Sequence, residues 1–150
     1  TMALAHWIRG ELQSRTPIRL ILSTPLALYT VSELVHAGNN GMCHVRHILG
    51  VLGSGEMALC GIGRTIPALA FGNLRDKSVA DVWFNTPMLQ ELRRELDEPY
   101  PGVCANCIHA GRCLTYCVAN NYEATGRLVA PSLLCAEAYE RGVFPAGRLR

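Results

Sequence analysis

Seven cysteines are the residues of this sequence with the clearest capacity for chemistry. Thiolates are strong ligands for zinc and for iron–sulfur clusters, whereas an odd number of cysteines cannot pair completely into disulfides. Four of the seven lie within fourteen residues. The set consists of Cys43, Cys60, Cys104, Cys107, Cys113, Cys117 and Cys135. Metal binding is therefore the chemistry that the sequence favours, and disulfides are the weaker alternative.

The spacing of these cysteines is more informative than their number. The dense run from Cys104 to Cys117 follows the pattern C-x2-C-x5-C-x3-C, and seventeen further residues separate it from Cys135. Upstream, Cys43 and Cys60 belong to the pattern C-x11-G-x4-C, in which the glycine is Gly55. A C-x2-C pair directs two sulfurs at one centre and occurs in both zinc and iron–sulfur sites. Iron–sulfur ligation is the favoured interpretation, and structural zinc stays open as an alternative.

The complete pattern resembles the seven-cysteine signature of the SPASM domain, the C-terminal auxiliary-cluster domain of many radical S-adenosylmethionine enzymes. Three other stretches are similar to that family: the G-N-L turn at 72–74, the helix start at 78–83 and the A-x-x-Y-x-x-T-G stretch at 119–126. The resemblance covers residues 43–135. It departs at 44–46, where the family often has small residues, and at 114–116, where the family often has two glycines.

The resemblance implies two [4Fe–4S] clusters with distinct ligand sets. The first cluster would be held by Cys43, Cys60 and Cys117, and the second by Cys104, Cys107, Cys113 and Cys135. Cys117 would therefore leave its sequence neighbours and bind the other cluster, as one cysteine does in two-cluster ferredoxins. Seven cysteines leave one of eight iron positions without a thiolate. We expect the first cluster to have an open or non-cysteine ligand, for which the candidates are His36, His44 and His47.

A missing motif bears on the mechanism. Radical S-adenosylmethionine chemistry starts at a C-x3-C-x2-C cluster, and no third cysteine follows Cys113 and Cys117 at that spacing. We therefore expect the chain to be the C-terminal part of a larger enzyme that modifies a peptide or protein. Its partners would be the missing barrel domain and the peptide substrate. S-adenosylmethionine would be a cofactor of the full-length enzyme, and this chain should not cleave it. The auxiliary clusters would serve electron transfer and substrate positioning.

Hydrophobic patterning predicts an α+β fold in three parts. Residues 1–41 are expected to form a helix, strand and helix at 2–14, 18–22 and 25–36, a remnant of a partial α/β barrel. Residues 42–140 are expected to form a small cysteine-rich domain with a β-hairpin and short helices around the two clusters. Residues 141–150 are expected to be a frayed tail. The loop at 37–41 is the predicted boundary.

Local signals within the cysteine-rich part predict the elements that position its ligands. The apolar runs 48–52 and 56–59, separated by Gly-Ser-Gly, predict a hairpin that brings Cys43 and Cys60 together. Capping signals at Ser78 and Thr86 predict two helices. The second helix should bury an apolar face formed by Met88, Leu89, Leu92 and Leu96. Trp7 and Trp83 are expected in the core, and Arg93 and Arg94 on a solvated face.

Composition excludes several classes of function. Hydrophobic residues make up 49% and charged residues 17% of the 150 residues, which argues against disorder. The net charge of +2 without a basic run makes nucleic acid an unexpected partner. No apolar stretch is long enough for a membrane helix, so cytoplasmic localisation is expected. Two alternatives remain: a zinc-binding protein-interaction module and a stand-alone electron carrier.

Overall fold

The computed structural model describes residues 2–36 and 43–150, so the boundary predicted at 37–41 lies outside the described residues. Short helices and a small antiparallel sheet confirm the α+β fold class. The helices are α1 (Met2–Trp7), α2 (Val31–His36), α3 (Val79–Asn85), α4 (Pro87–Asp97), α5 (Ala110–Cys113), α6 (Val118–Thr125) and α7 (Leu133–Glu140). The strands are β1 (Gly50–Val51), β2 (Glu56–Ala58) and β3 (Ala70–Asn73).

The sheet has the order β1-β2-β3, with both pairs antiparallel. The hairpin of β1 and β2 is confirmed, and Gly55 closes its turn at a φ of 85° that favours glycine. A side-chain Cβ at Gly55 would also lie 2.8 Å from Oδ1 of Asn73. The sequence predicts a turn at Gly72 and Asn73, but these residues end the strand β3 and pair with Met57 and Glu56. The register shifts between Met57 and Ala58, so that Phe71 is passed over.

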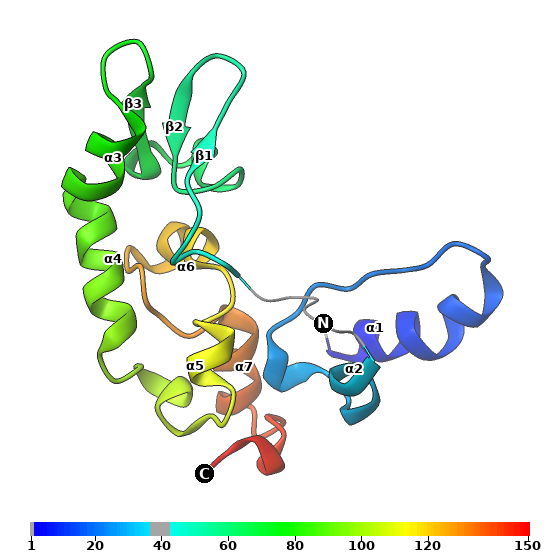
Figure 1. The fold of residues 1–150 in the computed structure, drawn as a ribbon. Coiled ribbons are helices and arrows are strands. Elements are labelled where there is room, and N and C mark those ends of the chain that lie inside the picture. Colours follow the sequence, from blue (N-terminus) through cyan, green and yellow to red (C-terminus); the bar gives the residue numbers. More distant parts are fainter. Residues whose placement is uncertain (1, 37–42) are drawn as a thin grey trace.

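Two consecutive helices connect the sheet with the cysteine run. Both predicted helix starts are confirmed: Ser78 Oγ accepts a hydrogen bond of 3.0 Å from the backbone N–H of Asp81, and α4 begins at Pro87. Helix α4 extends from the sheet toward α5 (Figure 1). Leu89, Leu92 and Leu96 of α4 are buried, as the apolar periodicity predicts.

The N-terminal part differs from its prediction. Residues 18–22 form no strand, and Ile18 and Ile21 are 68% and 69% exposed. A buried strand needs a partner, and no other described strand pairs with this stretch. Residues 2–15 are helical, as expected, but Trp7 is 43% exposed and is not a core residue. In Figure 1 this part of the chain extends away from the sheet and the C-terminal helices.

The helix predicted at 25–36 is also interrupted. A 3₁₀ turn covers Leu26–Leu28, Tyr29 is extended, and α2 starts after it. Thr30 caps α2: its Oγ1 accepts a hydrogen bond of 3.2 Å from the Glu33 N–H. The Glu33 carboxylate accepts a bond of 2.7 Å from the Thr30 N–H in return, which completes a capping box.

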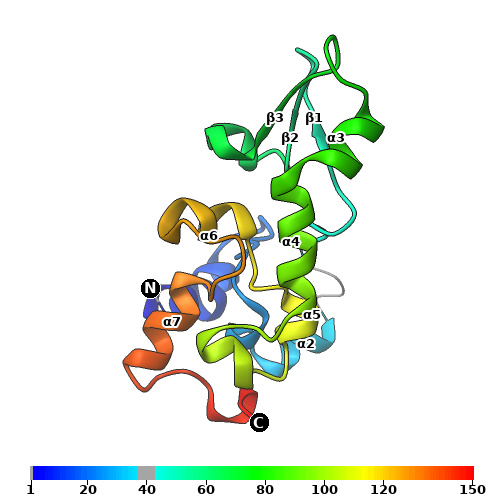
Figure 2. The same cartoon turned by 90° about the vertical axis from the view of Figure 1, so that its left-hand side faces the viewer.

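The C-terminal residues are packed, and the prediction of a frayed tail is wrong. Phe144 is buried against the core that contains three of the cysteines. The carbonyl oxygen of Arg148 accepts a hydrogen bond of 2.9 Å from Ile108, and that of Asn106 accepts one of 2.8 Å from Arg150. The tail therefore covers the loop that carries Cys107. Figure 2 shows the C-terminus beside the start of this loop, below α4.

The described residues contain two main buried cores. One joins the sheet, α3, α4 and α6, and includes the fully buried Met57, Leu59 and Leu69. The other lies between the 3₁₀ turn Gly102–Asn106, α5, α7 and the turn Leu26–Leu28. In the part of the chain that the structure describes, no helix has the length and apolar character needed to span a membrane.

Candidate iron–sulfur cluster sites

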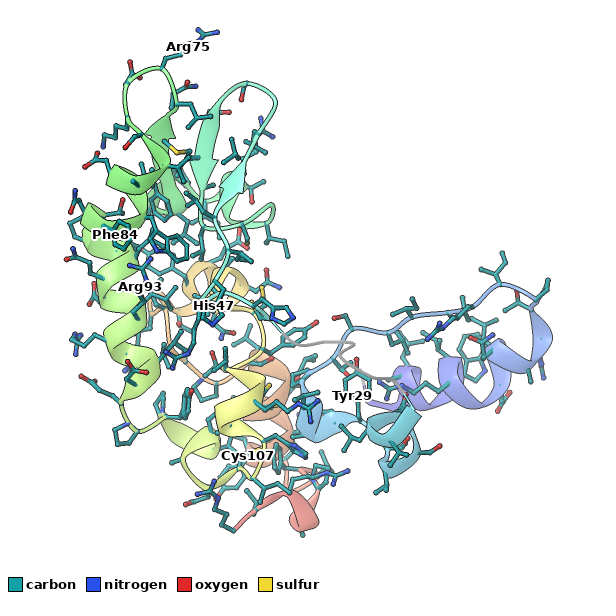
Figure 3. The ribbon with its side chains drawn as sticks, viewed as in Figure 1. Tyr29, His47, Arg75, Phe84, Arg93 and Cys107 are labelled. Atoms are coloured by element: carbon teal, nitrogen blue, oxygen red, sulfur yellow. The ribbon has the colours of Figure 1, made fainter. Side chains whose placement is uncertain are left out.

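Four buried cysteines line one cavity at the end of the molecule away from the sheet. Cys104 belongs to the turn Gly102–Asn106, and Cys107 follows it. Cys113 is the last residue of α5, and Cys135 lies in the first turn of α7. The cavity has a volume of about 20 Å³. Figure 3 labels Cys107, which lies beside α5 and the C-terminal turn. Three separate segments of the chain thus bring four thiols to one place.

Burial and close neighbours disfavour the ionised form of the thiols in this cavity. Burial, and then the neighbouring cysteines, raise the pKa of Cys104 from 9.0 to about 12. The same causes raise the pKa of Cys135 to about 12. Several thiolates at close range repel one another, and a low-dielectric surrounding strengthens that repulsion. A bound group of positive charge would remove this cost, so the four residues fit an iron–sulfur cluster.

Backbone N–H groups also point at one of these sulfurs. Burial raises the pKa of Cys113, whereas hydrogen bonds from the backbone of Leu26 and Tyr116 lower it in part. Such N–H donors stabilise a thiolate and belong to the usual surroundings of iron–sulfur ligands. Leu26 is far from Cys113 in the sequence, so the tertiary structure supplies one of the two donors.

His109 is a residue of this site that the sequence analysis missed. It lines the four-cysteine cavity, and its Nε2 is buried without a hydrogen-bond partner among the described residues. Burial, Arg148 and Arg112 lower the pKa of His109, which favours its neutral form. An unpartnered buried nitrogen beside four thiols is a second sign that the cavity suits a further polar group. Its position two residues after Cys107 was the signal available in the sequence.

The other three cysteines lie against the core of the sheet. Cys43, Cys60 and Cys117 are partly buried and pack on that core. Burial raises the pKa of Cys43, and the charges of Cys117, Cys60 and Cys113 add to this effect. Cys60 Sγ accepts a hydrogen bond of 3.3 Å from the Gly63 N–H. The structure therefore brings these three together and places Cys113 near them.

The histidines predicted as candidate ligands of the first cluster are not buried beside the cysteines in the part of the chain that the structure describes. His44 and His47 are exposed, and Figure 3 shows His47 between the sheet and the C-terminal helices. The side chain of His36 lies outside the described residues. Within 2–36 and 43–150, no three His, Cys, Asp or Glu side chains are arranged to hold a metal ion. A cubane cluster binds each thiolate on a different iron, so its ligands stand farther apart than those of one zinc ion.

The loop between Cys113 and Cys117 separates the two sets of cysteines. Leu114, Thr115 and Tyr116 all have positive φ, at 50°, 61° and 80°. Such a conformation costs about 1–2 kcal/mol for each residue that is not glycine. Asn121 holds the loop: its amide donates to the Thr115 carbonyl at 3.0 Å and to that of Ala130 at 2.8 Å. The left-handed turn sends Cys117 to the sheet side while Cys113 stays at the cavity.

The chain is similar to a known family over part of its length. Residues 43–108 match the family model of SPASM, described as an iron–sulfur cluster-binding domain. The match includes Cys43, Cys60, Cys104 and Cys107 and ends before the remaining three cysteines. No solved structure matches the chain significantly.

Several curated proteins are similar to the chain over part of their length. A PqqA peptide cyclase of Methylobacterium sp. (strain 4-46) is 33% identical over 85 residues, which are 57% of this chain and 21% of the relative. A PqqA peptide cyclase of Methylocella silvestris is 30% identical over 92 residues, or 60% of this chain and 24% of the relative. A third, from Methylobacterium nodulans, is 32% identical over 85 residues. The matched stretch thus spans less than a quarter of each relative.

The family match and the cysteine spacing overlap from Cys43 to Cys107. Both begin at Cys43, and both include the C-x2-C pair of Cys104 and Cys107. Over residues 43–108 the chain matches the SPASM iron–sulfur cluster-binding domain.

Proposed function

We propose that this chain holds two [4Fe–4S] clusters as the auxiliary-cluster part of a radical S-adenosylmethionine enzyme that modifies a peptide. The observation that carries the proposal is the cavity lined by Cys104, Cys107, Cys113 and Cys135. Four thiols from three segments of the chain line this one cavity, and four cysteine thiolates are the ligand set of a cubane cluster. These four would hold the second cluster.

Cys43, Cys60 and Cys117 would hold the first cluster. Each of them packs on the core of the sheet and is less buried than the other four. Three thiolates leave one iron without a cysteine. That iron would take water, a group of the substrate, or one of the exposed residues His44 and His47. The first cluster is therefore the one that could contact a substrate directly.

Each cluster would supply one-electron redox chemistry. The residues of the chain would hold the clusters, exclude water from the second one and supply N–H donors to its sulfurs. The proposed peptide substrate follows from the relatives, which are peptide cyclases by name. A reducing cytoplasm would keep the seven cysteines available for iron.

The proposed partner within the enzyme is a radical S-adenosylmethionine barrel. Support comes from the N-terminal part, which exposes apolar side chains that a further domain could cover. These are Leu4, Trp7, Ile18, Ile21, Val31 and Val35. The aligned part of the chain also covers only 21–24% of the length of the relatives, which are named as PqqA peptide cyclases.

Metal content after anaerobic reconstitution tests the proposal. We expect about eight irons and eight sulfides per chain, the content of two cubane clusters. Cys60→Ser and Cys135→Ser should each lower the count by about four, because each removes a ligand of one cluster. Zinc without sulfide in the reconstituted chain would overturn the proposal and favour an interaction module. A wild-type chain that holds only about four irons would contradict the proposed first cluster, if Cys135→Ser loses these irons and Cys60→Ser keeps them.

A further inference from the structure

A segment outside the matched SPASM residues forms one side of the four-cysteine cavity. Residues 25–29 are all buried, although they belong to the N-terminal part of the chain. Pro25 and Ala27 line the cavity directly. Between them, the backbone N–H of Leu26 donates a hydrogen bond to the sulfur of Cys113. We call residues 23–29 the cavity wall.

Two side chains from distant parts of the sequence hold the ends of this wall. The hydroxyl of Tyr116 lies 2.9 Å from the carbonyl oxygen and 3.0 Å from the Oγ of Ser23. At the other end, Nη2 of Arg148 donates a hydrogen bond of 3.2 Å to the carbonyl oxygen of Tyr29. The wall is thus fixed at both ends to segments that lie around the cavity.

Tyr116 contributes to the site in two ways. It lies between Cys113 and Cys117, where the family pattern often has glycine, and its φ of 80° is also one that favours glycine. Its own backbone N–H donates a hydrogen bond of 2.9 Å to the Cys113 carbonyl oxygen, and it also lowers the pKa of the Cys113 thiol, as the Leu26 backbone does. Its side chain reaches the wall, which a glycine at this position could not do. The side chain therefore explains why a residue other than glycine is useful there.

The cavity wall supplies burial and an N–H donor to the second cluster site. Burial and N–H···S hydrogen bonds set the reduction potential of an iron–sulfur cluster, and burial limits the access of water and oxygen. We propose that the wall closes the second cluster site and that Tyr116 is a positioning residue that holds the wall in place. This inference rests on the proposed function, because it concerns the cluster that the four cysteines would bind.

The test compares Tyr116→Phe with the wild-type chain after anaerobic reconstitution of both. The substitution keeps the ring and the backbone and removes the two contacts with Ser23. A chelator should remove iron from the second cluster roughly fivefold faster. Loss of one ordinary hydrogen bond changes the equilibrium between the closed and the open cavity wall by about this factor. The potential of that cluster should rise, because water stabilises the more highly charged reduced state.

Two controls separate a local effect from a general one. Tyr139→Phe removes a hydroxyl that has no hydrogen-bond partner among the described residues, on a ring that packs edge-on against Phe144. It should leave both clusters unchanged. Arg148→Gln loosens the other end of the wall and should act in the same direction as Tyr116→Phe. Each cluster is assigned in the redox titration by its loss in Cys60→Ser or in Cys135→Ser.

The outcomes distinguish this inference from the proposed function. A wild-type chain without the second cluster would overturn both. A wild-type chain with both clusters, in which Tyr116→Phe and Tyr139→Phe behave alike, would overturn the inference and leave the proposed function intact. Equal acceleration of iron loss from both clusters in Tyr116→Phe would also overturn it, because that result means a general loss of stability.

Discussion

The guanidinium group of Arg93 lies 4.4 Å from the centre of the Trp83 ring and donates a hydrogen bond of 2.8 Å to the Trp83 carbonyl oxygen. Arg93 belongs to α4 and Trp83 to α3, so this contact joins the two helices that connect the sheet with the cysteine run. Figure 3 shows Arg93 beside Phe84, the residue after Trp83. Arg93 is only partly exposed and not on a solvated face as predicted.

Replacing Arg93 with alanine should destabilise the fold by about 1–2 kcal/mol, the sum of a cation–π contact and one hydrogen bond. Chemical denaturation of the reconstituted protein would measure the change in free energy of unfolding. Arg94→Ala is the matched control. Arg94 is exposed and pairs with Glu91 and Glu98, and surface pairs of this kind contribute little. Equal effects of the two substitutions would contradict the prediction.

Asn121 should be required for the left-handed loop between the two sets of cysteines. It is 3% exposed, and its amide donates to Thr115 and to Ala130. Asn121→Ala leaves those carbonyl oxygens unpaired in the core and should cost about 2–3 kcal/mol. The neighbouring Asn120→Ala is the control, since Asn120 is exposed. Thermal unfolding of the reconstituted chains measures both, and an Asn121 variant as stable as the Asn120 variant would refute the assignment.

Cys113 and Cys117 are four residues apart and should serve different clusters. Cys113→Ala should remove the second cluster and Cys117→Ala the first, because the loop places their side chains against different cores. Iron counting gives a loss of about four in each case. Redox titration should then show that the remaining cluster differs between the two variants. The same cluster remaining in both would mean that the sequence neighbours share one site.

Cluster release should depend on pH. Without metal, burial raises the pKa of Cys104 and Cys135 from 9.0 to about 12, so both thiols hold their protons at neutral pH. Bound cysteines are thiolates, so release of the cluster takes up protons, and the binding free energy increases with pH up to about 12. Each of these thiols contributes about 1.4 kcal/mol per pH unit.

Iron extraction by a chelator between pH 6 and pH 9 would measure this dependence. We expect more extraction at the lower pH, after correction for the pH dependence of the chelator with free iron. Extraction that is independent of pH would show that the thiols of the released state are already ionised.

Much of the site could be predicted from local sequence. The turn at Gly55 and the cap at Ser78 depend on residues close in the chain, and the hairpin and α3 formed as predicted. The buried face of α4 followed from its periodicity. The strand at 18–22 failed because apolar residues form a strand only with a partner, and periodicity cannot supply one. His109 and β3 were missed because each depends on what lies beside it in space.

The sequence by itself determined the chemical identity of the site: seven cysteines, their spacing and the family that the spacing resembles. That information is local, because a C-x2-C pair directs its sulfurs together whatever surrounds it. Only the tertiary structure decided which surroundings each sulfur has. It placed the N–H of Leu26 and the ring of Tyr116 around Cys113, and it packed the C-terminal residues on the Cys107 loop. The physical reason is that burial and hydrogen bonding arise from contacts between segments about 40 to 120 residues apart, which no local pattern specifies.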